Sequence, residues 1–143
     1  MKTILLIHGA NLNLLGKRNS FHYGHFTLRQ LENKIKAEAK IHNFKVKSFQ
    51  SNHEGALVDF IQKNSAKASG IIINAGAFTH YSYALYDALV DAALPAIEVH
   101  LSDVKRREGW RKKSVIAPAC AMVISGKKEK GYNEAVAVLK KMI

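Results

Sequence analysis

Short apolar runs alternate along this chain with segments whose apolar residues recur at helical spacing. The apolar stretches at residues 3–7, 44–50, 70–74, 96–100 and 121–125 predict five β-strands. Apolar positions three and four residues apart predict helices after a capping box at Thr27, around residues 57–61, over 79–93 and over 132–142. Strands that alternate with helices form parallel sheets, so the pattern predicts an α/β fold with a doubly wound, five-stranded parallel sheet and helices on both faces.

The 143 residues contain no Pro-rich stretch and no long linker, which predicts a single domain spanning residues 1–143. The one cysteine, Cys120, cannot form an internal disulfide and is expected to be a small buried apolar residue. No run approaches the ~20 apolar residues that a membrane-spanning helix needs. We therefore expect a cytoplasmic location and no membrane partner.

The formal net charge of +11 raises the possibility of nucleic-acid binding. Most of the lysines, however, are dispersed over predicted helix faces and the C-terminal part of the chain, and no basic run is interleaved with aromatic residues. Residues 105–107 and 111–113 are the exception, because each is a dense basic triplet. Such a local cluster also suits a small anionic substrate, so we expect no nucleic-acid partner.

Polar loops follow four of the five predicted strands. Each of the segments 8–13, 50–54, 74–80 and 98–102 contains a histidine; the first three also contain asparagine, and the first and third contain glycine. One such loop is explained by turn formation alone. Four of them should meet at one edge of a parallel sheet, where open α/β sheets bind their ligands. The sequence therefore predicts a site at the carboxyl ends of the strands.

The residue types in these loops favour acid–base chemistry. The histidines lie on separate loops without metal-ligand spacing, and no dinucleotide, P-loop or nucleophile-elbow motif is present. We expect no metal and no cofactor. Glu98 and His100 lie two residues apart on one strand, so their side chains share a face and the carboxylate is able to orient the imidazole. The alternative is that Glu98 caps a backbone group and His100 is a satisfied core histidine.

A long loop, residues 14–24, separates the first strand from the first helix. Glycines at both ends make it a candidate mobile lid, and it carries two cations and Tyr23. Taken alone, Tyr23 is either a packing aromatic or a general base.

The four loop motifs together resemble the type II 3-dehydroquinate dehydratases. The similarity involves Asn-Leu-Asn-Leu-Leu-Gly at 11–16 with Arg18 and Tyr23-Gly24, Gln-Ser-Asn-His-Glu-Gly at 50–55, residues 72–80, and Glu-Val-His-Leu-Ser at 98–102, in order and at matching spacing. The resemblance implies a flavodoxin-like fold. It also implies the loss of water from 3-dehydroquinate to give 3-dehydroshikimate, by anti elimination through an enolate, in the shikimate pathway or in quinate breakdown.

The resemblance also implies roles for individual residues. Tyr23 looks like the base that takes the C2 proton, and Arg18 like its electrostatic activator. His100 looks like the acid that protonates the departing hydroxyl, with Glu98 orienting it. Asn11 stands where the family helps to hold the group that meets the enolate oxygen.

Further residues match positions that bind substrate. Those that resemble groups holding substrate hydroxyls are Asn74, His80 and Arg111. Leu101 and Ser102 look like a cradle for the substrate carboxylate. Asp87 resembles a residue that reaches a neighbouring subunit's site, in a dodecamer assembled from trimers.

The chain departs from the family pattern at several positions. Ala10 and Ala75 stand where the family usually has proline, so both loops should be less restricted in φ. Asn19-Ser20 replaces a common Glu-Pro in the lid. The other departures are His8, Phe78 and Tyr86. None of them removes a group with an implied catalytic role.

The sequence is also compatible with two other functions. One is a flavodoxin-like binding or signalling module, although the loop after the first strand lacks the acidic residues that a phosphoacceptor requires. The other is a basic nucleic-acid-binding protein. Turnover of 3-dehydroquinate, compared with a salt-dependent gel shift, distinguishes these alternatives from the enzyme.

Overall fold

A single parallel sheet forms the centre of the molecule. The computed structural model describes residues 1–143, and its strands are β1 (Lys2–His8), β2 (Phe44–Gln50), β3 (Gly70–Asn74), β4 (Ala96–His100) and β5 (Met122–Ser125). All four pairings are parallel, in the order β2-β1-β3-β4-β5. The predicted doubly wound α/β fold is confirmed, with β5 one residue shorter at its start than the apolar run suggested.

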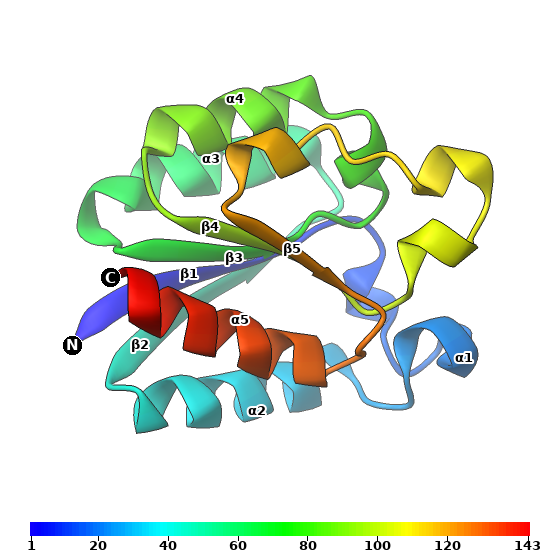
Figure 1. The fold of residues 1–143 in the computed structure, drawn as a ribbon, viewed down its shortest axis with the longest axis horizontal. Helices are drawn as coiled ribbons and strands as arrows, with labels where there is room; N and C mark the ends of the chain where they lie inside the picture. The colour runs from blue at the N-terminus through cyan, green and yellow to red at the C-terminus, as the bar shows by residue number, and fades with distance from the viewer.

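Helices cover both faces of the sheet (Figure 1). On one face lie α2 (Leu28–Ile41) and α5 (Lys130–Met142), and on the other α3 (Glu54–Asn64) and α4 (Tyr83–Ala92). Side chains of β1 alternate between the two: Ile4 and Leu6 belong to the cluster under α2 and α5, whereas Leu5 and Ile7 belong to the one under α3 and α4. Burial on both faces explains why β1 and β3 are continuous apolar runs rather than alternating ones.

The predicted capping box is present at the start of α2. The Thr27 side chain accepts a hydrogen bond from the backbone N–H of Gln30, whose side chain accepts one from the Thr27 N–H. The prediction for α4 was wrong by four residues, because the helix begins at Tyr83 instead of Thr79. The Ser82 hydroxyl caps this helix, and the preceding segment turns as a 3₁₀-helix, η3 (Gly76–His80).

Short turns replace a helix between β4 and β5. The connection contains three 3₁₀ segments, η4 (Val104–Arg106), η5 (Gly109–Arg111) and η6 (Ala117–Ala119). The predicted lid, residues 14–24, contains a one-turn helix, α1 (Ser20–Tyr23), capped by the Asn19 side chain. Figure 1 shows α1 and the turns that follow β4 at the same end of the sheet, where the strands end.

The remaining 3₁₀ turns are η1 (Leu12–Leu14) after β1 and η2 (Ser65–Lys67) after α3. No helix combines the length and the apolar character needed to cross a membrane. Cys120 is partly buried against the cluster under α3 and α4, and burial raises the pKa of its thiol to about 12. The thiol therefore stays protonated at neutral pH, in keeping with its predicted packing role.

Ala75 allows a test of whether restricting the backbone of the loop after β3 stabilises the protein. Its φ of −76° suits proline, its backbone N–H donates no hydrogen bond, and the preceding Asn74 is in a strand. Ala75→Pro should therefore raise the free energy of unfolding by about 0.4–1 kcal/mol, because it restricts the unfolded chain. Urea denaturation at fixed protein concentration measures the change.

Ala75→Gly is the matched control and should shift the stability in the opposite direction, since glycine frees the unfolded chain and removes a fully buried methyl group. A proline variant that is less stable than the parent protein would show that the buried loop has no room for the ring.

Candidate active site

A pocket opens at the carboxyl ends of β1, β3 and β4. Nine of the eleven predicted site residues line it: Asn11, Arg18, Tyr23, Asn74, His80, His100, Leu101, Ser102 and Arg111. The other two lie outside its lining. Glu98 is fully buried next to His100, and Asp87 is exposed on α4. The prediction that the polar loops meet at one edge of the sheet is therefore confirmed.

Close backbone contacts form the floor of the pocket. A Cβ on Gly9 would lie 2.0 Å from the carbonyl oxygen of Ala75, and one on Gly76 would lie 2.6 Å from that of Ala10. Only glycine therefore fits at these two positions. The loops after β1 and β3 are in direct contact, and they present Asn11 in a left-handed conformation at φ 69°.

The Asn11 backbone is held by the loop after β2. Its N–H donates to the side-chain oxygen of Asn52 at 2.9 Å, and Gln50 Nε2 donates to the same oxygen at 3.1 Å. Gln50 Nε2 also lies 3.2 Å from the carbonyl oxygen of Gly9. The Gln-Ser-Asn motif thus does not line the pocket but holds the backbone of the loop after β1, which does.

His100 and Glu98 form a direct buried pair. His100 Nε2 contacts Glu98 Oε2, and the other carboxylate oxygen accepts a hydrogen bond from the Ser114 hydroxyl at 2.7 Å. An ionised carboxylate only accepts, so Glu98 fixes the hydrogen of the imidazole on Nε2. Glu98 therefore does not cap a backbone group, because both of its carboxylate oxygens are occupied by side chains.

Two guanidinium groups converge on the phenol oxygen of Tyr23. Arg18 Nη2 donates to it at 2.9 Å and Arg107 Nη1 at 2.7 Å, while Arg18 also stacks over the ring at 3.7 Å from the centroid. Two cationic donors on one oxygen favour its negative form, as a general base requires. Burial lowers the pKa of Arg18, yet a guanidinium remains charged at neutral pH.

Asn74 is fixed from both ends of its amide. Its oxygen accepts from the Gly76 N–H at 3.1 Å, and its nitrogen lies 3.4 Å from the hydroxyl of Tyr132 on α5. Tyr132 is fully buried, and burial raises the pKa of its hydroxyl, so this partner stays neutral. The remaining N–H of the Asn74 amide is available to a ligand.

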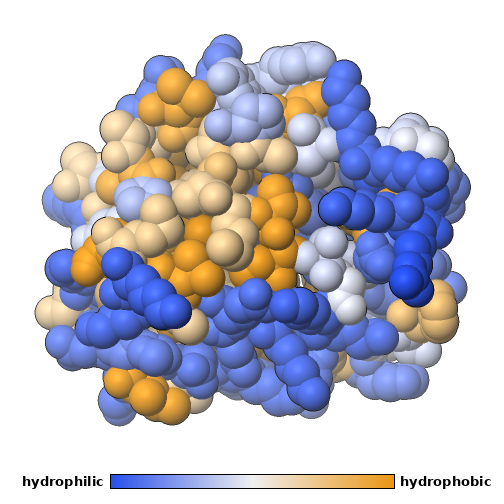
Figure 2. All heavy atoms as spheres, in the orientation of Figure 1, coloured by the Kyte–Doolittle hydropathy of each residue, from blue (hydrophilic) through white to orange (hydrophobic).

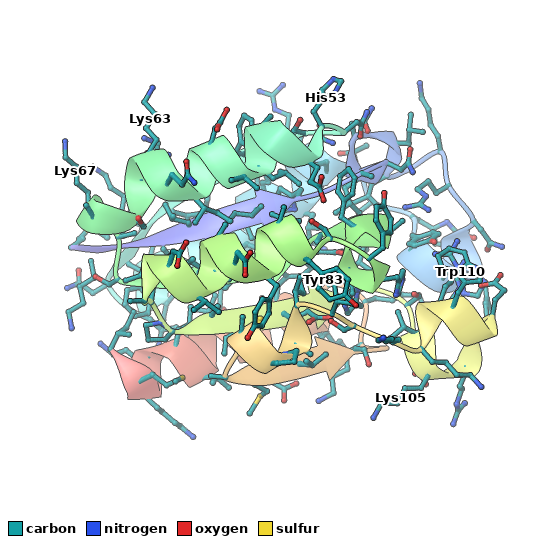
Figure 3. The ribbon with its side chains drawn as sticks, turned by 90° about the horizontal axis from the view of Figure 1, so that it is seen from above. His53, Lys63, Lys67, Tyr83, Lys105 and Trp110 are labelled. Carbon is teal, nitrogen blue, oxygen red and sulfur yellow. The ribbon has the colours of Figure 1, made fainter.

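His80 and Arg111 share an aromatic neighbour at the rim. Trp110 packs edge-on against the His80 ring at 5.2 Å between centroids, and its own ring carries the Arg111 guanidinium at 4.0 Å. Figure 3 shows Trp110 at the end of the molecule opposite to Lys63 and Lys67. Arg111 and His80 are thus held at the strand-end edge by a residue that is itself half exposed.

Arg107, Ser114 and Tyr132 were missed by the sequence analysis. A signal existed for Arg107, since it belongs to a basic triplet that was interpreted as a cluster near an anionic ligand. Nothing in that triplet, however, indicates which of its side chains enters the pocket. Ser114 and Tyr132 act through contacts that join distant parts of the chain and had no local signal. No three His, Cys, Asp or Glu side chains gather as a metal site.

Known proteins resemble this chain over nearly its whole length. The sequence model of the family "Dehydroquinase class II" matches residues 2–140. The chain is 50% identical over 135 residues to a catabolic 3-dehydroquinase of Penicillium rubens, covering 94% of this chain and 87% of that protein. It is 48% identical over 143 residues to a 3-dehydroquinate dehydratase of Bacillus cytotoxicus, covering 99% and 98%.

A solved structure gives the same result. The type II dehydroquinase from Butyrivibrio crossotus matches with a TM-score of 0.93 and 45% identity, over 96% of this chain and 97% of that one.

The protonation state of His80 is open to direct measurement. Burial lowers the pKa of His80 from its ordinary 6.5, the charge of Arg111 lowers it further, and a hydrogen bond to the Lys113 carbonyl opposes the change. Because that carbonyl only accepts, Nδ1 at 2.7 Å carries the hydrogen and Nε2 is left as an acceptor. Nitrogen NMR should therefore show the Nδ1–H tautomer at pH 7, with a titration midpoint below 6.5.

The His80→Gln variant identifies the signal among the seven histidines of the chain, and the same titration in urea gives the unfolded reference. An Nε2–H tautomer, or a midpoint at or above the urea value, would contradict the assignment.

Proposed function

The chain belongs to the class II dehydroquinase family, and we propose that its strand-end pocket converts 3-dehydroquinate to 3-dehydroshikimate by acid–base chemistry alone. One observation supports this most strongly. The Tyr23 phenol, with its two guanidinium donors, and the His100 imidazole, with its carboxylate, line one pocket. A base and an acid are therefore both within reach of one small molecule. The signalling and nucleic-acid-binding alternatives are not supported.

In the proposed reaction the Tyr23 oxygen takes the C2 proton of the substrate. The electrons of the broken C–H bond move into the neighbouring carbonyl and form an enolate, while Arg18 and Arg107 stabilise the phenolate that acts as base. The enolate then expels the hydroxyl group from the adjacent carbon. His100 gives that oxygen a proton, so water leaves and a conjugated double bond remains.

Glu98 and Ser114 serve this second step. The Glu98 carboxylate stabilises the His100 imidazolium until the imidazolium donates its proton. The carboxylate also fixes the orientation of the imidazole ring. Ser114 holds the other oxygen of Glu98 and so fixes the carboxylate itself. Asn11, in the left-handed turn above the glycine contacts, lies where it helps to hold the group that meets the enolate oxygen.

The remaining pocket residues bind the substrate. We assign its hydroxyl groups to Asn74, His80 and Arg111. The backbone N–H groups of Leu101 and Ser102 donate to no protein acceptor, which supports a cradle for the substrate carboxylate. Their carbonyls are already used by the turn after β5, through the N–H groups of Lys128 and Gly126.

We further propose that several copies of the chain assemble around shared sites. Figure 2 shows apolar side chains gathered over β5 and the segment before it. Met122 and Val123 of β5 are exposed, as are Tyr83 and Val90 of α4, the helix that also carries Asp87. A dodecamer built from trimers, with Asp87 reaching a neighbour's pocket, would bury this surface. We also propose a cytoplasmic location.

Turnover of 3-dehydroquinate, followed by the ultraviolet absorbance of the conjugated product, tests the function. The parent protein should be active and Tyr23→Phe inactive, because the variant lacks the base. His100→Ala should lower kcat by about 10²–10⁴-fold through loss of general-acid help. Glu98→Gln should cost less, since the imidazole remains and loses only its charged partner.

An inactive parent protein would contradict the proposed function, and a near-normal kcat for His100→Ala would contradict the role of that residue alone. Substrate binding to the Tyr23→Phe variant, measured by isothermal titration calorimetry, is the control for an intact pocket.

Asp87→Ala tests the shared site. If Asp87 contacts substrate in a neighbouring pocket, the variant should raise KM while sedimentation still shows the parent assembly. Dissociated trimers of the parent protein should show the same loss of affinity. A monomer with full activity would contradict the assembly proposal and leave the reaction unaffected.

A further inference from the structure

The carboxylate of Glu108 lies between two arginines of the pocket. Its Oε2 atom is 2.7 Å from Nε of Arg111 and 3.8 Å from Nε of Arg107. The Glu108 side chain is 57% exposed, whereas those of Arg107 and Arg111 are 10% and 21% exposed. Glu108 therefore contacts both cations from the solvent side and stays outside the pocket lining.

No other acceptor serves the Nε atoms of these two arginines. Both Nε atoms are buried, and neither makes a hydrogen bond of good geometry with any protein group, so the two contacts with Glu108 are ion pairs. The opposite edge of Arg107 is in use, because its Nη1 donates to the Tyr23 oxygen and lies 3.4 Å from the Ser102 hydroxyl. Glu108 thus holds the end of the guanidinium that the pocket does not use.

Glu108 also reduces the electrostatic repulsion among the arginines of the pocket. Arg18, Arg107 and Arg111 all line one pocket, and their mutual repulsion opposes their convergence. The pKa of Glu108 is held below its ordinary value, by a hydrogen bond with its own backbone N–H and by the charges of Arg111 and Arg107. The carboxylate is therefore ionised throughout the neutral range and offsets part of that repulsion.

The backbone is suited to this arrangement. Glu108 precedes the 3₁₀ turn η5, and its carbonyl accepts from the Arg111 N–H at 2.8 Å. The turn brings residues i and i+3 onto one side, so the Glu108 and Arg111 side chains meet. The neighbouring Arg107 reaches the same carboxylate from the other direction.

We propose that Glu108 is a positioning residue that holds the Nε edges of Arg107 and Arg111, and thereby directs Arg107 onto the Tyr23 phenol. It acts through the arginines and does not touch the substrate. This inference rests on the proposed function, because Tyr23 is taken as the base.

Glu108→Gln tests the proposal, since it keeps the length of the side chain and removes the charge. We expect kcat for 3-dehydroquinate to fall about tenfold, with a smaller change in KM. In an Arg107→Ala background the same change should alter kcat less than twofold, because residues that act through one contact are not additive. Glu108→Asp, which keeps the charge on a shorter stem, should restore part of kcat.

A second measurement does not depend on activity. Trp110 is the only tryptophan of the chain and carries the Arg111 guanidinium on its ring. Loosening Arg111 should expose the indole further, so Glu108→Gln should shift the tryptophan emission to longer wavelength. Glu134→Gln is the matched control, because Glu134 is a partly exposed carboxylate paired with Lys127 outside the pocket, and the change should alter neither kcat nor emission.

The outcomes separate the two proposals. An active parent protein whose kcat and emission are unchanged by Glu108→Gln overturns the positioning role and leaves the reaction intact. Effects of Glu108→Gln that multiply with those of Arg107→Ala also overturn it, since they would indicate general destabilisation. An inactive parent protein overturns the proposed function, and the emission shift then still tests the contact with Arg111.

Discussion

The contact between the loops after β1 and β3 is the constraint on which the rest of the pocket depends. Gly9 lies against the Ala75 backbone and Gly76 against that of Ala10, at separations that exclude any side chain. Two strands that are neighbours in the sheet therefore end in loops that touch, and the Gly9 N–H closes the contact by donating to the Asn74 carbonyl at 2.7 Å. Asn11 and Asn74 are fixed relative to each other by backbone, which moves little, rather than by long side chains.

This rigid floor contrasts with the part of the site that carries charge. The charged groups lie outside the sheet: Arg18 and Tyr23 are in the predicted lid, residues 14–24, and Arg107 and Arg111 are in the turns after β4. At an effective dielectric of ~20, a cation ~3 Å from a phenolate oxygen attracts it by roughly 5 kcal/mol, and at ~6 Å by about half that. The electrostatic effect of the arginines therefore depends on their placement to within about an ångström. The segments that carry them are not held by hydrogen bonds between strands. Ion pairs and stacking, rather than sheet hydrogen bonds, have to supply that placement.

The sequence predicted the sheet and the position of the site for a physical reason. Strands buried on both faces are apolar throughout, and parallel strands bring their carboxyl ends to one edge, so the polar loops had to converge. The start of α4 was predicted wrongly because residues 79–82 belong to the turn that precedes the helix, and the apolar spacing does not separate a 3₁₀ turn from the first turn of an α-helix. The hydroxyl that caps the helix is that of Ser82, which donates to Glu54 on α3, a contact that joins residues 28 positions apart.

Arg107 shows the limit of sequence reasoning most clearly. It follows Lys105 and Arg106, and the three share charge and length. The turn η4 directs Arg107 into the pocket, while Arg106 pairs with Asp103 and is mostly exposed. The family resemblance supplied roles for most of the pocket, but supporting contacts such as Ser114 to Glu98 become visible only when distant segments are placed side by side.

The two edges of the sheet differ in a way that bears on assembly. The outer strand β2 carries Lys45 and Lys47 exposed to solvent, and lysines on an edge strand discourage pairing with another chain. The outer strand β5 instead exposes Met122 and Val123. A chain with a formal net charge of +11 repels its own copies at long range, so association requires apolar surface that is free of lysine. Of the two edges, only the one at β5 offers such a surface, and α4, which carries Asp87, also exposes apolar side chains. The proposed assembly would therefore use the side of the sheet from which Asp87 is proposed to reach a neighbouring pocket, and not the lysine-bearing edge at β2.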